Sequence, residues 1–220
     1  MGIAQAGLAF RIQGPNKDVR GLISRLFDQE ATEIPRPDRG KFDIRNHSEV
    51  MVQVFGDVCF ICNNDLVWNV LERPQEDTKR LFLLLGSPEF MLAFCHYDSG
   101  GSYGYTVIER GVRTRSRLQT TDVPRLPPLI EYGEPKAFEV SWLSASYYLE
   151  EDDCPPEERV KIYYQGNREI LVAEHSLTAR MLFDALESFF GVCPWRTDVV
   201  PIYRFFQLGP KKRPWWRIRR

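Results

Sequence analysis

The sequence predicts an α+β protein whose mainly antiparallel sheet, made of meanders and hairpins, is packed by two long amphipathic helices. Short runs with a two-residue apolar alternation recur between turns rich in Gly, Asn and Asp. Only two segments, about 16–28 and 176–190, carry a sustained helical stripe of apolar residues. Strands and helices do not alternate regularly, which disfavours a parallel doubly wound sheet or barrel.

Both helices are expected from the spacing of their apolar residues and from their ends. Asn16 is a suitable N-cap for the first helix, and Ser176 and Gly191 suit the two ends of the second. The first stripe consists of Val19, Leu22, Ile23, Leu26 and Phe27. The second consists of Leu177, Met181, Leu182, Ala185, Leu186 and Phe189. Each spacing places one apolar face against the sheet.

The remaining pattern is that of strands. They are expected at 6–13, 50–55, 58–63, 66–71, 90–97, 103–110, 112–118, 160–164, 170–172 and 202–208, and 137–149 is aromatic and strand-prone. The glycine-rich segment 98–102 joins two of these strands, so it is expected to be a hairpin turn and not a phosphate-binding loop. Arg113, Arg115 and Arg117 alternate along one strand. We expect them on one face, either as a solvated edge strand or as a phosphate-binding stripe.

The chain is expected to form a single globular domain over 1–210, followed by a basic tail that contains tryptophan, 211–220. The segment 121–136 holds four prolines and is the best candidate for a long surface connection. A divergent two-lobe organisation, with its connection at 121–136, is the alternative.

Cysteine usage and hydropathy favour the cytoplasm. The five cysteines are an odd number at irregular spacings, which is typical of free thiols in a reducing compartment. No run of 18 apolar residues occurs, and the first residues lack the basic and apolar regions of a signal peptide.

The formal net charge of −1 conceals an asymmetry. The last ten residues hold six basic residues and no acid, so 23 basic and 30 acidic residues remain in 1–210, a formal charge of −7. The most concentrated acids form one loop: Glu150, Glu151, Asp152, Asp153, Glu157 and Glu158. Such a loop is either solvated or a recognition surface for a basic protein partner, because complementary charge speeds encounter.

The tail has a composition suited to anionic surfaces. Its candidate residues are Lys211, Lys212, Arg213, Trp215, Trp216, Arg217, Arg219 and Arg220. Indole rings favour membrane interfaces, and they also stack on nucleic-acid bases beside neutralising cations. A membrane surface or a nucleic acid is therefore a candidate partner, while a frayed terminus and a tail folded onto the acidic loops are the alternatives.

The sequence shows no recognisable set of catalytic, cofactor-binding or metal-binding residues. Cys59 and Cys62 have a metal-ligand spacing, but residues three apart on a strand face opposite sides, and no second pair follows. The motifs of serine hydrolases, zinc proteases and phosphate-binding loops are missing. We therefore expect no cofactor and no metal.

These observations favour a non-enzymatic protein-binding domain. The most concrete form is an immunity-type protein that neutralises a cognate bacterial toxin through an acidic surface. One alternative is an enzyme whose site is assembled from dispersed residues, with His47, His96, Asp98 and Glu109 as candidates. The other alternative is a peripheral binder of membranes or nucleic acid that acts through the tail.

Overall fold

A computed structural model of the chain describes residues 4–12, 18–38, 42–75, 77–121, 123–124, 126–150 and 153–210. Most of the described strands form one nine-stranded sheet in the order β2-β12-β3-β4-β1-β5-β6-β7-β8, in which every pairing is antiparallel. Its strands are β1 (Ala4–Arg11), β2 (Ala31–Ile34), β3 (Glu49–Phe55), β4 (Val58–Cys62), β5 (Phe90–Tyr97), β6 (Ser102–Glu109), β7 (Val112–Gln119), β8 (Leu129–Tyr132) and β12 (Ile202–Leu208).

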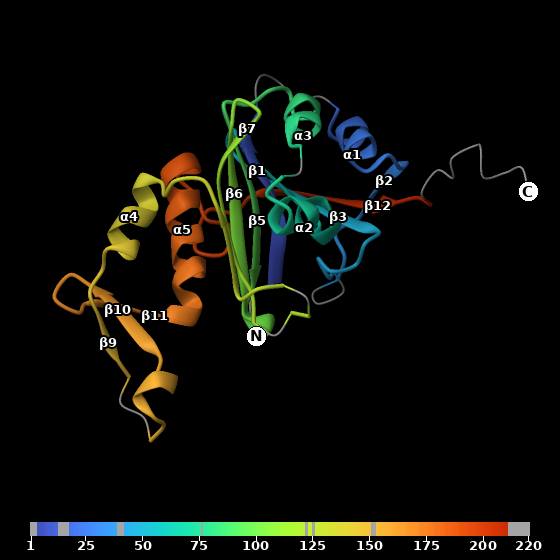
Figure 1. The fold of residues 1–220 in the computed structure, drawn as a ribbon. Coiled ribbons are helices and arrows are strands. Elements are labelled where there is room, and N and C mark those ends of the chain that lie inside the picture. Colours follow the sequence, from blue (N-terminus) through green and yellow to red (C-terminus); the bar gives the residue numbers. More distant parts are fainter. Residues whose placement is uncertain are drawn as a thin grey trace, which may run out of the picture.

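A second, three-stranded antiparallel sheet has the order β11-β10-β9 and lies beside the main sheet (Figure 1). Its strands are β9 (Tyr147–Leu149), β10 (Lys161–Gln165) and β11 (Ile170–Ala173). The helices are α1 (Val19–Phe27), α2 (Asn64–Glu72), α3 (Lys79–Leu84), α4 (Ala137–Leu143) and α5 (Leu177–Phe190). The predicted α+β class, with a large antiparallel sheet, is confirmed.

Helices cover both faces of the main sheet. Figure 1 shows α1, α2 and α3 on one side and α5 on the other, with α4 outside α5. The two predicted amphipathic helices are α1 and α5. The first begins at Val19, where the Asp18 carboxylate accepts a hydrogen bond of 2.7 Å from the Gly21 amide, so Asp18 is the cap in place of Asn16. Residues 13–17 lie outside the described part of the chain. Gly191 ends α5 in a left-handed conformation, as expected.

The strand predicted at 66–71 is wrong, because this segment lies in α2. Its Val67, Val70 and Leu71 are buried at helical spacing, and α2 packs on β1 and β5. The intrinsic preference of β-branched and aromatic residues for strands is weak compared with burial of a complete apolar face. The chain therefore passes from β4 into a helix that covers the sheet. Of the three consecutive strands predicted at 50–55, 58–63 and 66–71, only the first two form, as β3 and β4.

The prediction that Arg113, Arg115 and Arg117 share one face is also wrong. A bulge in the β6–β7 pairing opposes Ile108 to Arg113 but Val107 to Arg115, so Thr114 is an extra residue. Arg113 consequently reaches the α2 side, where it donates to the Val70 carbonyl at 2.7 Å. Arg115 and Arg117 point to the α4–α5 side. All three are buried, and β8 pairs with β7, so they are neither an edge nor a solvated stripe.

Large apolar side chains from both faces form the core. Phe60 contacts Phe94 and Phe190 edge to face, which joins β4, β5 and α5. The hairpin expected at 98–102 is present as a short 3₁₀ turn at Asp98–Gly100, followed by Gly101 with φ +57°, a conformation that favours glycine. No helix within the described ranges combines the length and the apolar character needed to cross a bilayer.

Thiol reactivity tests this burial. All five cysteines are free, and Cys59, Cys62, Cys95 and Cys193 are buried. Burial raises the pKa of the Cys59 and Cys193 thiols to about 12. Since the thiolate is the reactive form, a disulfide reagent at neutral pH is expected to label only the half-buried Cys154 in the folded protein, and all five thiols in denaturant. Rapid labelling of a second thiol under native conditions would contradict this packing.

Candidate functional site

The segment 137–173 contains α4 and the three-stranded sheet, and we call it the projecting unit. The first half of the predicted strand 137–149 is in fact α4, because Glu139 and Trp142, one helical turn apart, are both buried against the rest of the protein. Glu139 also accepts a hydrogen bond of 2.7 Å from the Lys136 amide and so closes the first turn of the helix. Only the last part of the predicted strand, Tyr147–Leu149, forms β9.

The carboxylate of Glu139 is fully buried and joins α4 to the main sheet. Arg115 on β7 donates through Nε to both of its oxygens, at 2.9 and 3.0 Å. The Tyr105 hydroxyl on β6 donates to Oε1 at 2.6 Å. Burial, and next the nearby Glu139 carboxylate, raises the pKa of Tyr105 well above its usual value, so this hydroxyl keeps its proton.

The network continues toward α5 and β8. Glu131 on β8 accepts hydrogen bonds from both Arg115 and Arg117, and Arg117 Nε donates to the Thr178 hydroxyl on α5 at 2.9 Å. Trp142 on α4 adds a second link, since its Nε1 donates to Asp184 on α5 at 2.7 Å. These contacts, which are buried or partly buried, fix the orientation of the projecting unit relative to the sheet.

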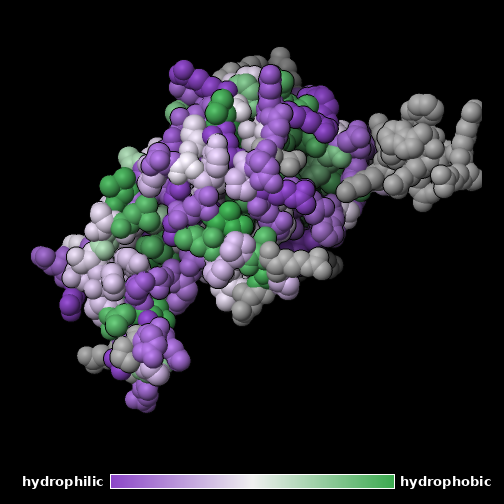
Figure 2. Space-filling view, viewed as in Figure 1, coloured by the Kyte–Doolittle hydropathy of each residue, from purple (hydrophilic) through white to green (hydrophobic). Residues whose placement is uncertain are grey.

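The surface of the projecting unit exposes large apolar side chains. Exposed fractions lie between 39% and 52% for Val140, Leu143, Tyr147, Leu149, Ile170 and Leu171. The register of the small sheet places Tyr147, Leu149 and Ile170 on one of its faces. Figure 2 shows apolar side chains over α4 and further ones on the small sheet, among polar neighbours.

The acidic loop predicted as a partner-binding surface belongs to this same unit. Glu150, Asp153, Glu157 and Glu158 are exposed, and Glu150 and the other acids lie between β9 and β10. The backbone closes the loop where the Glu150 amide donates to the Val160 carbonyl at 2.9 Å. Glu151 and Asp152 lie outside the described residues, as do all the tail residues from Lys211 to Arg220.

The candidates for a dispersed enzyme site lie in three places. His96 Nδ1 lies 3.3 Å from Asp98 Oδ1 at the end of β5. His47 pairs with Asp65 at 2.5 Å on the α2 side and is largely exposed. Glu109, at the other end of β6, pairs with Lys136 at 2.6 Å, and the hydrogen bond from Lys136 lowers its pKa. The structure therefore brings His96 and Asp98 together and keeps His47 and Glu109 apart from them.

The described part of the chain contains no cluster of side chains suited to binding a metal ion. No three His, Cys, Asp or Glu side chains there are arranged to hold a metal ion. Cys59 and Cys62 are both buried in β4, three residues apart on a regular strand, so they face opposite sides as predicted.

No family model, no curated protein and no solved structure matches this chain.

Substitution of Glu139 tests the anchor of the projecting unit. Glu139→Ala leaves the Arg115 guanidinium and the Tyr105 hydroxyl without their buried acceptor. We expect the free energy of unfolding to fall by about 3–5 kcal/mol, as when one partner of a buried ion pair is removed. Urea unfolding monitored by circular dichroism measures this change.

Glu89→Ala is the matched control, because Glu89 pairs with Arg110 at 3.4 Å on the surface, where both side chains are more than half exposed. We expect it to change stability by less than about 1 kcal/mol. Equal effects of the two substitutions would show that the buried network does not hold the unit.

Proposed function

We propose that this protein is a non-enzymatic protein-binding domain that holds a basic protein partner on its projecting unit. The observation that supports this most directly is the coincidence of exposed apolar side chains and exposed acids on one unit beside the main sheet (Figure 1). A protein-binding surface needs both features, since apolar contact supplies affinity and charge selects the partner.

The apolar side chains favour contact with a protein. Val140, Leu143, Tyr147 and Leu149 are exposed to solvent in the free chain, and their burial would contribute about 25 cal/mol for each Å² of apolar area removed from water. Leu129 and Tyr132 on β8, which leads into α4, are also exposed and enlarge this apolar surface. Exposed apolar side chains that gather over adjoining elements are typical of interaction sites.

The charge of the unit favours a basic partner. Residues 137–173 contain eight acidic and three basic residues, a formal charge of −5. One of the acids, Glu139, is already neutralised by Arg115 in the core, so the others set the field outside. Complementary charge of this kind steers encounter and makes the association rate depend on salt.

An immunity-type protein, which neutralises a cognate bacterial toxin by covering it, is the most concrete class with these properties. Such a protein needs a rigid surface and fast capture, and it needs no catalytic residue. The buried network supports the first requirement and the acidic field supports the second.

Affinity capture with charge-reversed variants tests the proposal. Glu157→Lys combined with Glu158→Lys reverses two exposed acids of the projecting unit. We expect wild-type protein to retain a basic protein whose association rate falls as salt rises, and this double variant to retain much less of it. Surface plasmon resonance with the captured partner measures the rate constants.

The matched control is Glu30→Lys combined with Glu89→Lys, which changes the charge equally at exposed acids outside the unit. This variant should keep the partner. A second pair of variants tests the apolar contribution: Val140→Gln should weaken retention, whereas Val200→Gln, at an 83% exposed site outside the unit, should not. A partner retained equally by all four variants, or the absence of any retained protein, would refute the proposal.

A further inference from the structure

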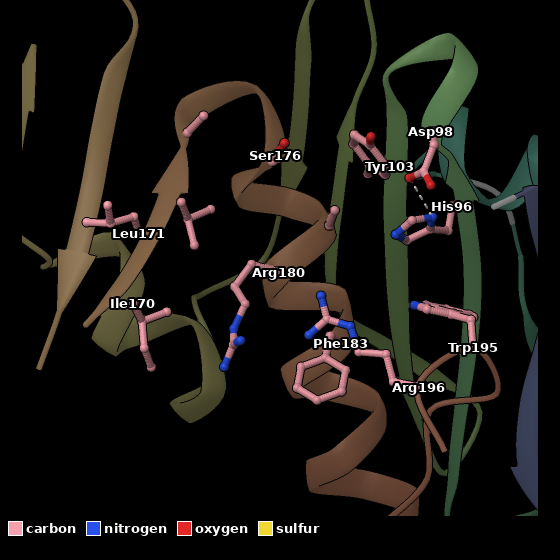
Figure 3. A pocket seen from close by; sticks show the side chains of 13 residues that line it. His96, Asp98, Tyr103, Ile170, Leu171, Ser176, Arg180, Phe183, Trp195 and Arg196 are labelled. Carbon is pink, nitrogen blue, oxygen red and sulfur yellow. Dashed lines mark ion pairs between the residues drawn. The ribbon is translucent and has the colours of Figure 1, made fainter. Parts of the chain in front are cut away.

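A cleft of about 430 Å³ lies between the main sheet, α5 and β11, and the proposed protein-binding surface does not account for it. Side chains from β5, β6, β11, α5 and the loop after α5 converge on it (Figure 3). The polar and aromatic side chains that line it include His96, Asp98, Arg180, Phe183, Trp195 and Arg196. The volume falls in the range of pockets that hold small molecules.

One end of the cleft is cationic. The guanidinium groups of Arg180, from α5, and Arg196, from the loop after α5, lie 5.1 and 4.4 Å from the centre of the Phe183 ring. Arg180 also pairs with Asp184 at 3.0 Å. Within the described residues no carboxylate lies within ion-pair distance of Arg196, so one positive charge at the cleft has no ionic partner.

Arg196 has no ionic partner among the described residues, so a ligand anion that contacts its guanidinium would supply one. Arginine presents several N–H donors in one plane, a geometry that matches the oxygens of phosphate and carboxylate. This end of the cleft is therefore suited to a ligand oxyanion.

The opposite wall presents a buried histidine between aromatic rings. The His96 side chain is only 9% exposed, and its ring centre lies 4.9 Å from that of Trp195 and 5.0 Å from that of Tyr103. Nδ1 faces Asp98, although no atom of the described chain completes a hydrogen bond with it. The other ring nitrogen faces the cavity toward α5 (Figure 3).

Burial lowers the pKa of His96; the Asp98 carboxylate opposes this effect and Arg196 adds to it. The ring is therefore neutral at neutral pH. The nearby carboxylate favours the tautomer with its proton on Nδ1, which leaves Nε2 as an acceptor toward the cleft. A ligand group that meets His96 should then donate a hydrogen bond, as a hydroxyl does.

Trp195 offers apolar ring surface to a ligand, and Ile170 and Leu171 of β11 close the side of the cleft. A ligand that satisfies all parts needs an oxyanion, a planar ring and hydroxyl donors. We propose that the cleft binds a small phosphorylated ligand with an aromatic ring and hydroxyl groups, in the size class of a nucleoside monophosphate.

Calorimetric titration of the full chain with AMP, CMP, GMP and UMP tests this proposal, with adenosine and inorganic phosphate as partial ligands. We expect at least one nucleotide to bind, and more tightly than either partial ligand, because each of these lacks the groups that meet one part of the cleft. Failure of all four to bind at millimolar concentration would overturn the proposal. So would inorganic phosphate that binds as tightly as the nucleotides. These comparisons need no substitution.

Two variants locate the binding. Arg196→Gln removes the arginine that has no ionic partner among the described residues. It should weaken nucleotide binding about tenfold or more, the effect of losing one charge-assisted hydrogen bond. Trp195→Leu should reduce the preference for nucleotide over inorganic phosphate by about fivefold or more, through loss of ring stacking.

Arg25→Gln is the matched control, because Arg25 is an exposed arginine of α1 and should leave binding unchanged. Wild-type affinity in Arg196→Gln would overturn the assignment to this cleft. Glu157→Lys combined with Glu158→Lys should bind nucleotide normally, so this result is independent of the protein-binding proposal.

Discussion

The carboxylate of Glu139 lies where no water reaches it and contacts Arg115, Tyr105 and the Lys136 amide together. Any arrangement that moved α4 away from β6 and β7 would leave a buried guanidinium, a buried carboxylate or both without partners, which costs several kcal/mol. Glu131 and Arg117 extend the same constraint to β8 and α5. One polar cluster thus sets the position of α4, and through α4 the position of the small sheet that follows it in the chain.

Both proposed sites depend on that position. The apolar and acidic surface of the projecting unit faces a partner in one orientation only if α4 is fixed. The nucleotide cleft needs β11 to lie opposite His96, and β11 reaches the main body through α5, which itself contacts Arg117 and Trp142. A rigid anchor is also what allows a binding surface to be preorganised, so that little entropy is lost on association.

The sequence predicts the parts of the fold that depend on local periodicity. The stripes of α1 and α5, the hairpin at 98–102 and the strands at both ends of the chain follow from spacing and turn residues. The predictions are wrong where contacts between residues distant in the sequence determine the local structure. Burial against β1 and β5 turns 66–71 into a helix, the bulge at Thr114 divides three alternating arginines between two faces, and Glu139 starts a helix with no serine or threonine before it. The acidic loop is visible in the sequence, whereas Trp195, Arg196 and His96 meet only through the packing of α5 on the sheet.

Hydrogen exchange of the full chain, wild type against Glu139→Gln, tests the role of the anchor most directly. This substitution keeps the side-chain volume and removes the charge that pairs with Arg115. We expect faster exchange of the amides in α4 and in β9 to β11, with the central strands β1, β4 and β5 unchanged. Unchanged exchange in the projecting unit, or equal acceleration over the whole main sheet, would show that Glu139 is not the anchor.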